Sequence, residues 1–204
     1  IITPSVVCFD GRQAWIGKKA DLRKQIQPAD VIEFVKRDMG KPVKPRPGET
    51  TADSAPYEKD GFCWGAAGIS ALILRKLKRD ALRHLKKLGR LDAGADEHSI
   101  EVDAVITVPA YFGGPERDAT VLAGYAAQLN VIGVINEPTA AALSYGLTSD
   151  RHARILVFDL GGGTFDVTVL QMEGHNARVL TSRGNNTLGG KDWDAIIEGY
   201  ICLL

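Results

Sequence analysis

The clearest hydrophobic pattern lies in residues 155–170, where apolar and polar side chains alternate on both sides of Gly161-Gly162-Gly163-Thr164. Such alternation around a glycine-rich turn predicts a β-hairpin. Three successive glycines let backbone N–H groups approach an anion with no Cβ in the way, and Thr164 adds a hydroxyl beside them. The pattern therefore predicts a phosphate-binding turn, although glycines that merely fit the turn are an alternative.

Asp159 ends the first strand of this hairpin, directly before the glycines. A carboxylate beside bound phosphate groups needs a cation between the two negative charges. We therefore expect Asp159 to face a phosphate-bound cation or an attacking water.

A long helix is predicted over residues 66–88, with Gly89 as its stop. Its apolar positions recur at intervals of three and four, and this stripe is expected to be buried: Leu74, Leu77, Ala81, Leu85 and Leu88. The rest of the helix is rich in Arg and Lys, which favours a solvated face over a site for phosphate or an acidic partner.

The second half of the chain alternates strands and helices. After an acidic loop over 91–101, a buried strand is expected at 102–108, a helix at 115–129, a strand at 131–135 and an alanine-rich helix from 136 to about 146. This order is typical of an α/β core. After the hairpin, a third strand at 177–182 and a helix from 191 are predicted.

The first sixty residues are less regular. Two short strands are expected before residue 17, and helical or mixed segments at 20–27 and 29–39, separated by Pro28. Four prolines among charged and small residues predict a loop over 41–60. Because the chain begins within an expected strand, we expect it to be a fragment.

Composition excludes several classes of protein. Among 204 residues, 25 Lys and Arg balance 25 Asp and Glu, which argues against a protein dedicated to nucleic acid or an anionic membrane. No apolar run is long enough to span a membrane and no leader is visible, so a cytoplasmic location is expected. The three cysteines are widely spaced and are interpreted as small buried side chains. Neither they nor the four histidines have the spacing of a metal site.

Several motifs together resemble one family. They are VITVPAYF at 105–112, INEPTAAALSYGL at 135–147, FDLGGGTFDVTVL at 158–170 and LGGKDWD at 188–194, together with TPSVVCF at 3–9, IGKKA at 16–20 and FVKRDMG at 34–40. In this order they resemble the nucleotide-binding domain of the heat shock protein 70 chaperones. The resemblance implies a partial, two-lobed α/β fold of the actin-like (ribonuclease H-like) ATPase class, with ATP or ADP and Mg²⁺ between the lobes.

The resemblance also implies roles for individual residues. Lys36 matches the lysine that holds the γ-phosphate or the attacking water, and Asp159 the carboxylate that organises hydrated magnesium. Glu137 matches a carboxylate of the interlobe helix. The second phosphate loop is matched by Gly161, Gly162, Gly163 and Thr164.

Two further residues, Pro109 and Arg117, match a relay that reports nucleotide state. For each of these matches a plainer interpretation stays open. Lys36 is also an ordinary surface lysine, Glu137 a helix-start carboxylate, Pro109 a strand terminator and Arg117 an exposed helical charge.

The sequence departs from the family pattern at several places. Asn185 stands where a metal-associated aspartate is usual, and Lys191 where an acidic residue is common. The glycine-rich first phosphate loop is absent, as are the adenosine-binding half of the second lobe and the substrate domain. We therefore expect this chain to be inactive alone.

By resemblance, the full-length protein is an ATPase that couples nucleotide state to the binding of unfolded polypeptide clients, with a J-domain co-chaperone and a nucleotide exchange factor as partners. The expected division is 1–98 for the periphery of lobe I, 99–150 for part of its core, and 151–204 for the first half of the lobe II core. An actin-like scaffold protein and a small-molecule kinase of the same fold are the alternatives. The isolated chain is expected to self-associate.

Overall fold

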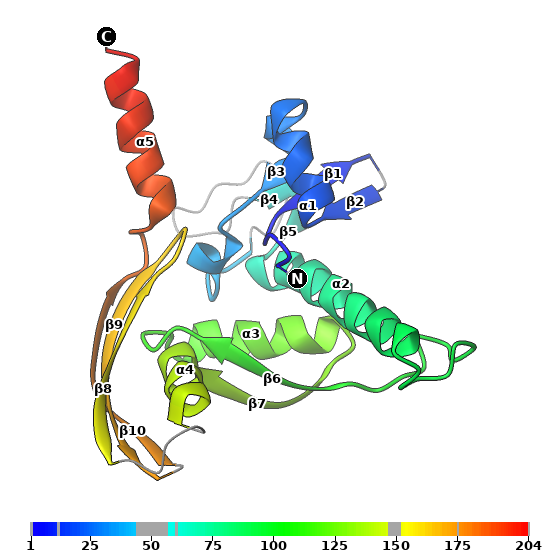
Figure 1. Cartoon of the computed structure of the whole chain (residues 1–204). Coiled ribbons are helices and arrows are strands. Elements are labelled where there is room, and N and C mark those ends of the chain that lie inside the picture. The colour runs from blue at the N-terminus through cyan, green and yellow to red at the C-terminus, as the bar shows by residue number, and fades with distance from the viewer. Residues whose placement is uncertain are drawn as a thin grey trace. The chain divides into compact units, whose positions relative to one another are not determined.

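The computed structural model describes residues 2–11, 13–43, 57–59, 61–146, 152–174 and 176–203 (Figure 1). The chain divides into two compact units, each built from two stretches of sequence. The first unit combines Ile1–Ile106 with Gly114–Gly133, and the second combines Thr107–Gly113 with Val134–Leu204. The expected assignment of 1–98, 99–150 and 151–204 to two lobes refers to a complete domain and stays a prediction.

The first unit begins with a small antiparallel sheet. Its central strand β1 (Val7–Asp10) pairs with β2 (Gln13–Ile16) on one side and β3 (Val31–Ile32) on the other. The early strands and the mixed character of the segments around Pro28 are thus confirmed. One helical turn and three 3-10 turns complete this part: α1 (Lys18–Asp21), η1 (Leu22–Gln25), η2 (Pro28–Asp30) and η3 (Val35–Asp38).

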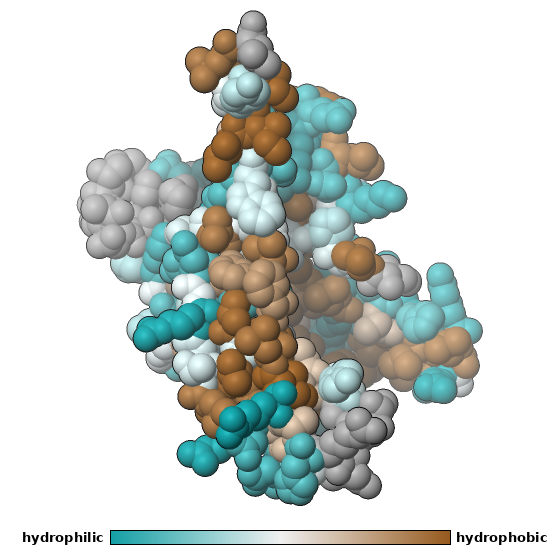
Figure 2. All heavy atoms as spheres, turned by 60° about the vertical axis from the view of Figure 1, so that its left-hand side comes forward, coloured by the Kyte–Doolittle hydropathy of each residue, from teal (hydrophilic) through white to brown (hydrophobic). Residues whose placement is uncertain are grey.

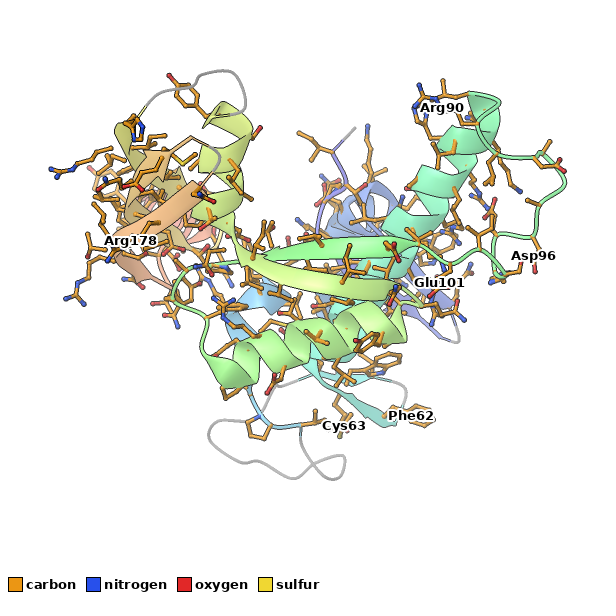
Figure 3. The ribbon with its side chains drawn as sticks, turned by 90° about the horizontal axis from the view of Figure 1, so that it is seen from below. Phe62, Cys63, Arg90, Asp96, Glu101 and Arg178 are labelled. Carbon is orange, nitrogen blue, oxygen red and sulfur yellow. The ribbon has the colours of Figure 1, made fainter. Side chains whose placement is uncertain are left out.

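A two-stranded hairpin follows that the sequence analysis did not predict. It consists of β4 (Tyr57–Lys59) and β5 (Phe62–Trp64), and Figure 3 labels Phe62 and Cys63 on its second strand. Residues 57–59 were expected to belong to a loop. Residues 44–56 and 60 of that expected loop lie outside the described residues.

The three cysteines differ in their surroundings. Cys8 is buried beside Ala20, and burial raises the pKa of its thiol, so it stays protonated. Cys63 is only half-buried and Cys202 is exposed. The prediction that all three are buried is wrong for these two, because β5 belongs to a two-stranded hairpin and Cys202 follows a helix whose side chains are mostly exposed.

The predicted long helix is α2 (Ala66–Lys87), followed by Gly89 with the left-handed φ of 67° that favours glycine. The prediction of its buried face is wrong. Leu77, Leu85 and Leu88 are exposed, whereas Ile69 and Leu82 are buried. The helix contacts α3 (Gly114–Ala126), η3 and the β1–β2 hairpin, and these neighbours lie on a different side from the leucine stripe.

The basic residues of α2 bind neighbouring backbone. Lys78 is buried, and its Nζ donates to the carbonyl oxygen of Gln128 at 2.7 Å, just beyond the end of α3. Arg75 donates to the carbonyl oxygen of Ala126 at 3.0 Å. A cation is stabilised at the carboxyl end of a helix, where backbone carbonyls lack partners. The interpretation of this face as solvated is therefore wrong for Lys78.

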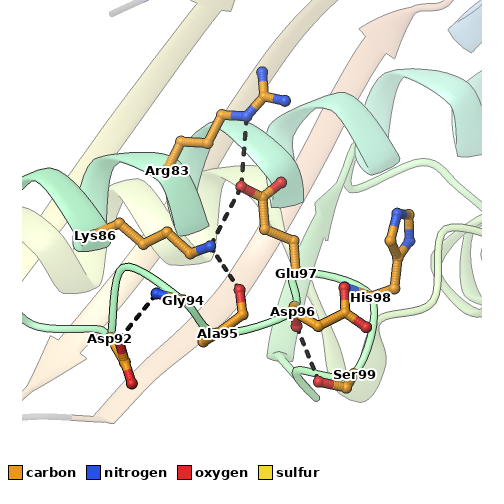
Figure 4. A network of polar contacts seen from close by, with 9 residues as sticks. All are labelled: Arg83, Lys86, Asp92, Gly94, Ala95, Asp96, Glu97, His98 and Ser99. Atoms are coloured by element: carbon orange, nitrogen blue, oxygen red, sulfur yellow. Dashed lines mark hydrogen bonds and ion pairs between the residues drawn. The ribbon is translucent and has the colours of Figure 1, made fainter.

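The acidic loop after α2 folds back onto the helix (Figure 4). Glu97 forms ion pairs with Arg83 at 3.5 Å and with Lys86 at 3.9 Å. The ammonium group of Lys86 also donates a hydrogen bond to the carbonyl oxygen of Ala95 at 2.6 Å. Side-chain hydrogen bonds stabilise turns within the loop. For example, the carboxylate of Asp96 accepts a hydrogen bond from the backbone N–H of His98. The loop thus neutralises part of the basic face.

The predicted strand–helix–strand–helix segment is confirmed. It consists of β6 (Asp103–Val108), α3, β7 (Asn130–Asn136) and α4 (Glu137–Gly146), with β6 and β7 in one two-stranded sheet. A Cβ added at Gly124 of α3 would lie 2.9 Å from the Cδ1 of Ile106 and 2.4 Å from the Cγ2 of Val131, so a larger residue there would force these side chains to shift. The expectation of a fully buried strand is wrong, since Val105 is exposed.

The second unit is built on a three-stranded antiparallel sheet in the order β10–β9–β8. Its core lies where Ala142 and Leu143 of α4 pack on Leu170 and Met172. The predicted hairpin, third strand and last helix are all confirmed. They are β8 (Ala153–Leu160), β9 (Phe165–Glu173), β10 (Asn176–Asn185) and α5 (Gly190–Ile201).

Apolar side chains lie exposed along α5 and on one face of this sheet, where Figure 2 shows them as a brown band. Ile196 is 70% exposed on α5, and Phe158 is 62% exposed on β8. Exposed apolar patches of this kind favour association, and both edge strands of the described sheet present unpaired backbone groups.

We therefore expect the isolated 204-residue chain to form dimers or larger assemblies at micromolar concentration, as measured by light scattering. Replacing Ile196 and Ile197 by Gln should shift the chain towards monomer. The matched control Leu88→Gln changes an exposed leucine of the first unit and should leave the assembly unchanged. A monomer over a wide concentration range would contradict this prediction.

Among the helices of the described residues, none combines the length and the apolar character needed to cross a membrane.

Candidate phosphate-binding hairpin

The glycine-rich turn, residues 161–164, joins β8 to β9 and is called the phosphate loop below. The last strand pair is Leu160 opposite Phe165, so the loop has four residues, and the Gly161 N–H donates to the Thr164 carbonyl oxygen at 2.9 Å. The rings of Phe158 and Phe165 lie 5.0 Å apart beside it. The hairpin predicted from alternation is therefore present, with a short and closed tip.

The start of α5 packs directly against the phosphate loop. The N–H of Gly190 donates to the carbonyl oxygen of Gly161 at 3.1 Å, and the N–H of Lys191 donates to that of Gly162 at 2.9 Å. A Cβ added at Gly189 would lie 2.6 Å from backbone atoms of Gly162 and Gly163, which no side chain permits. Glycine at 189 is thus required by close backbone approach.

These two hydrogen bonds fix the direction of two peptide groups. In a planar trans peptide the N–H points away from the preceding carbonyl oxygen. Because the carbonyls of Gly161 and Gly162 point towards α5, the N–H groups of Gly162 and Gly163 point to the opposite side of the loop. Successive N–H groups that share a direction form an anion-binding concavity.

Two aspartates lie opposite each other next to the loop. Asp159 of β8 is paired in register with Asp166 of β9, so their side chains share one face of the sheet. Asp166 is only 4% exposed, and a Cβ added at Gly184 of β10 would meet its Oδ1 at 2.3 Å, whereas Asp159 is exposed. Like charges directly opposite on a sheet are unfavourable, so this pair suits a cation.

Asp166 was not singled out in the sequence, although the hairpin itself could have revealed it. In a four-residue turn, Gly161 faces Thr164, Leu160 faces Phe165, and Asp159 then faces Asp166. Mg²⁺ is commonly held by one or two carboxylates together with phosphate oxygens and water, so the two aspartates fit a phosphate-bound magnesium. Within the described residues, no group of three or more His, Cys, Asp or Glu side chains is arranged to hold a metal alone.

The sheet below the loop is held by polar and apolar contacts. Thr168 is fully buried, and its hydroxyl shares a hydrogen bond of 2.8 Å with the hydroxyl of Ser182 across β9 and β10. Further along the same face, Leu170 and Met172 pack against α4. Polar and apolar contacts therefore hold the base of the hairpin, and α5 contacts its tip.

Comparison with known proteins identifies the family of this chain. Residues 1–203 match the protein family described as Hsp70 protein. The chain is also 43% identical over 201 residues to the chaperone protein DnaK of Mycoplasmopsis pulmonis (strain UAB CTIP), an alignment that covers 98% of this chain and 29% of that relative. The chain belongs to the Hsp70 family. It spans less than a third of the length of this relative.

Membership of the Hsp70 family leaves the role of each matched residue to be tested. Glu137 begins α4 and is half-buried, in the same unit as the hairpin. Pro109 is buried directly after β6, and its carbonyl oxygen accepts from the N–H of Phe112 at 3.2 Å. Arg117 is half-buried near the start of α3 and belongs to the first unit.

Lys36 lies in η3, also in the first unit, and is half-buried. The turn is anchored by Val35 and Met39, both buried, and by Asp38, which accepts hydrogen bonds from Tyr57 and from Lys41. Burial and then Asp38 raise the pKa of Tyr57, so its hydroxyl stays protonated and donates. Since Lys36 and the phosphate loop belong to different units, the role of Lys36 rests on the family resemblance alone.

Of the two departures from the Hsp70 pattern, one ends β10 and the other lies in the first turn of α5. Asn185 ends β10, and its Oδ1 accepts from the N–H and the hydroxyl of Thr187, each at 2.9 Å. Its amide therefore holds the turn that leads into α5. Lys191 uses its backbone N–H to bind the phosphate loop.

Proposed function

We propose that this chain is part of the nucleotide-binding domain of an Hsp70 chaperone, an ATPase whose nucleotide state controls the binding of unfolded polypeptides. The complete domain then has the two-lobed actin-like fold, with this chain supplying parts of both lobes. The observation that carries the proposal is the phosphate loop, where two N–H groups share one direction beside the Asp159–Asp166 pair.

The chemistry of ATP hydrolysis matches what this hairpin offers. Phosphoryl transfer to water demands positioning and charge stabilisation rather than covalent catalysis. Backbone N–H groups of the phosphate loop bind phosphate oxygens, and the Thr164 hydroxyl adds a further donor. Asp159 and Asp166 are the residues that would hold Mg²⁺, which would supply positive charge to neutralise the phosphates.

The carboxylates complete the proposed site. Asp159, exposed beside the loop, would help to hold hydrated magnesium and would orient the attacking water. Asp166 lies opposite and adds a second negative charge for the cation. Glu137 assists in orienting the water and Lys36 contacts the γ-phosphate once the complete domain closes around ATP, as the family resemblance implies.

The proposed partners follow from the same assignment. Unfolded or extended polypeptides bind to a domain outside this chain, a J-domain co-chaperone stimulates hydrolysis, and a nucleotide exchange factor releases ADP. Pro109 and Arg117 transmit the nucleotide state, and the protein works in the cytoplasm. No role in binding nucleic acid or a membrane is proposed.

Full-length protein tests this function directly. We expect magnesium-dependent ATP hydrolysis in single-turnover assays, and weaker binding of an unfolded fluorescent peptide with ATP than with ADP. ATP-dependent filaments seen by light scattering would favour the scaffold alternative. Transfer of the γ-phosphate to a sugar or another small molecule would favour the kinase alternative, and either result would overturn the proposal.

The isolated chain should bind ATP weakly or not at all. The chain spans less than a third of the length of its relative, so we expect it to supply too few contacts to offset the entropic cost of immobilising the nucleotide. Isothermal titration calorimetry of the isolated chain, with full-length protein as the positive control, measures this difference. Submicromolar binding by the isolated chain would contradict the prediction.

A further inference from the structure

The first turn of α5, residues 189–192, is closed by the side chain of Asp192. The N–H of Gly189 donates to Asp192 Oδ2 at 2.8 Å, and the N–H of Asp192 donates back to the carbonyl oxygen of Gly189 at 3.0 Å. Because Gly189 has no side chain, this arrangement is the carboxylate half of a capping box, in which a side chain in the first turn binds the backbone N–H of the residue that precedes the helix.

The residues held by this arrangement are the ones that contact the phosphate loop. Gly189 packs against the backbone of Gly162 and Gly163, while Gly190 and Lys191 supply the two N–H donors described above. A change in the entry angle of α5 therefore moves both donors together. The carbonyls of Gly161 and Gly162 would lose the bonds that direct their peptide groups.

We propose that Asp192 is a positioning residue for nucleotide binding. It holds the first turn of α5 so that the N–H groups of Gly162 and Gly163 face the phosphates. This inference rests on the proposed ATPase function, and it assigns to Asp192 no contact with the nucleotide.

The charge of Asp192 cannot account for such a role, because a carboxylate beside a phosphate site repels the ligand. The contribution of Asp192 is instead the side-chain oxygen that accepts a hydrogen bond from the N–H of Gly189. Asp192→Asn keeps an acceptor of the same reach and removes the charge, whereas Asp192→Ala removes both. Asp194, exposed on the same helix, provides the control Asp194→Ala with an identical change in net charge.

The experiment uses full-length protein and its three variants, and measures the dissociation constants of ATP, ADP and adenosine by calorimetry. For Asp192→Ala we expect the constants for ATP and ADP to rise about tenfold, as for the loss of one supporting hydrogen bond, with adenosine unchanged. Asp192→Asn and Asp194→Ala should stay close to the parent protein. This selectivity for phosphate-bearing ligands separates positioning of the loop from general damage to the fold.

A second measurement does not depend on nucleotide. Hydrogen exchange at the amides of residues 161–164 in the nucleotide-free protein should accelerate in Asp192→Ala and be restored in Asp192→Asn. Unchanged exchange, or an equal loss of affinity for adenosine and ATP, would overturn the inference. If the parent protein fails to bind ATP, the proposed function is wrong, while the exchange result still decides whether Asp192 holds the loop.

Discussion

Asp159→Asn in the full-length protein is expected to lower the single-turnover rate of ATP hydrolysis by roughly a hundredfold or more, the scale for losing one preorganised electrostatic group. Asparagine keeps the size of the side chain and an oxygen acceptor, but it removes the charge that hydrated magnesium needs. Asp159 is exposed on β8, so the fold should be unaffected. Rates are measured by rapid quench at saturating Mg–ATP.

The control for this prediction is Asp194→Asn, which makes the same chemical change at an exposed position of α5. It should retain the parental rate. Melting curves recorded for all proteins ensure that equal folded fractions are compared. A rate within a few-fold of the parent for Asp159→Asn would remove this residue from the mechanism and weaken the ATPase assignment of the hairpin.

Gly189→Ala should reduce hydrolysis by about a hundredfold, because misplacing a binding group by about 1 Å has an effect of this size. The added methyl group would lie 2.6 Å from backbone atoms of Gly162 and Gly163, and backbone cannot yield as a flexible side chain can. The phosphate loop must therefore separate from α5. ATP affinity measured by calorimetry should fall together with the rate.

Gly199→Ala is the matched control, since Gly199 lies within the same helix and a Cβ there would meet nothing within 4 Å. Alanine favours a helix over glycine by about 0.5–1 kcal/mol, so this variant should hydrolyse ATP normally and melt at the same or a slightly higher temperature. Equal activity of the two variants would show that the contact between α5 and the loop is unimportant for catalysis.

Local sequence patterns were sufficient to predict most of the helices and strands. The alternation in 155–170 predicted β8 and β9, and the three- and four-residue spacing in α2 predicted a helix that ends before Gly89. These features depend on preferences of residues that are close in sequence, so they can be predicted from the sequence alone. The β4–β5 hairpin was missed because three-residue strands carry too little periodicity.

The sequence patterns did not predict which face of each element is buried. On α2, the periodicity predicted that the leucine stripe is buried. However, α3 and η3 pack on other sides of the helix and leave Leu77, Leu85 and Leu88 exposed. Lys78 is buried instead, because its ammonium group reaches the carbonyl end of α3. Burial depends on neighbours that are distant in sequence, and periodicity does not identify them.

At the candidate site, sequence patterns predicted the glycine turn with Asp159 beside it, and the motifs identified the family to which the chain belongs. Only the tertiary structure brought the first turn of α5 against that turn and placed Asp166 opposite Asp159. Gly189 and Asp192 lie more than twenty residues from the loop along the chain, and hydrogen bonds between such segments form only after the sheet and helix have docked. The direction of the loop's N–H groups, on which the proposed phosphate binding depends, was therefore decided by packing.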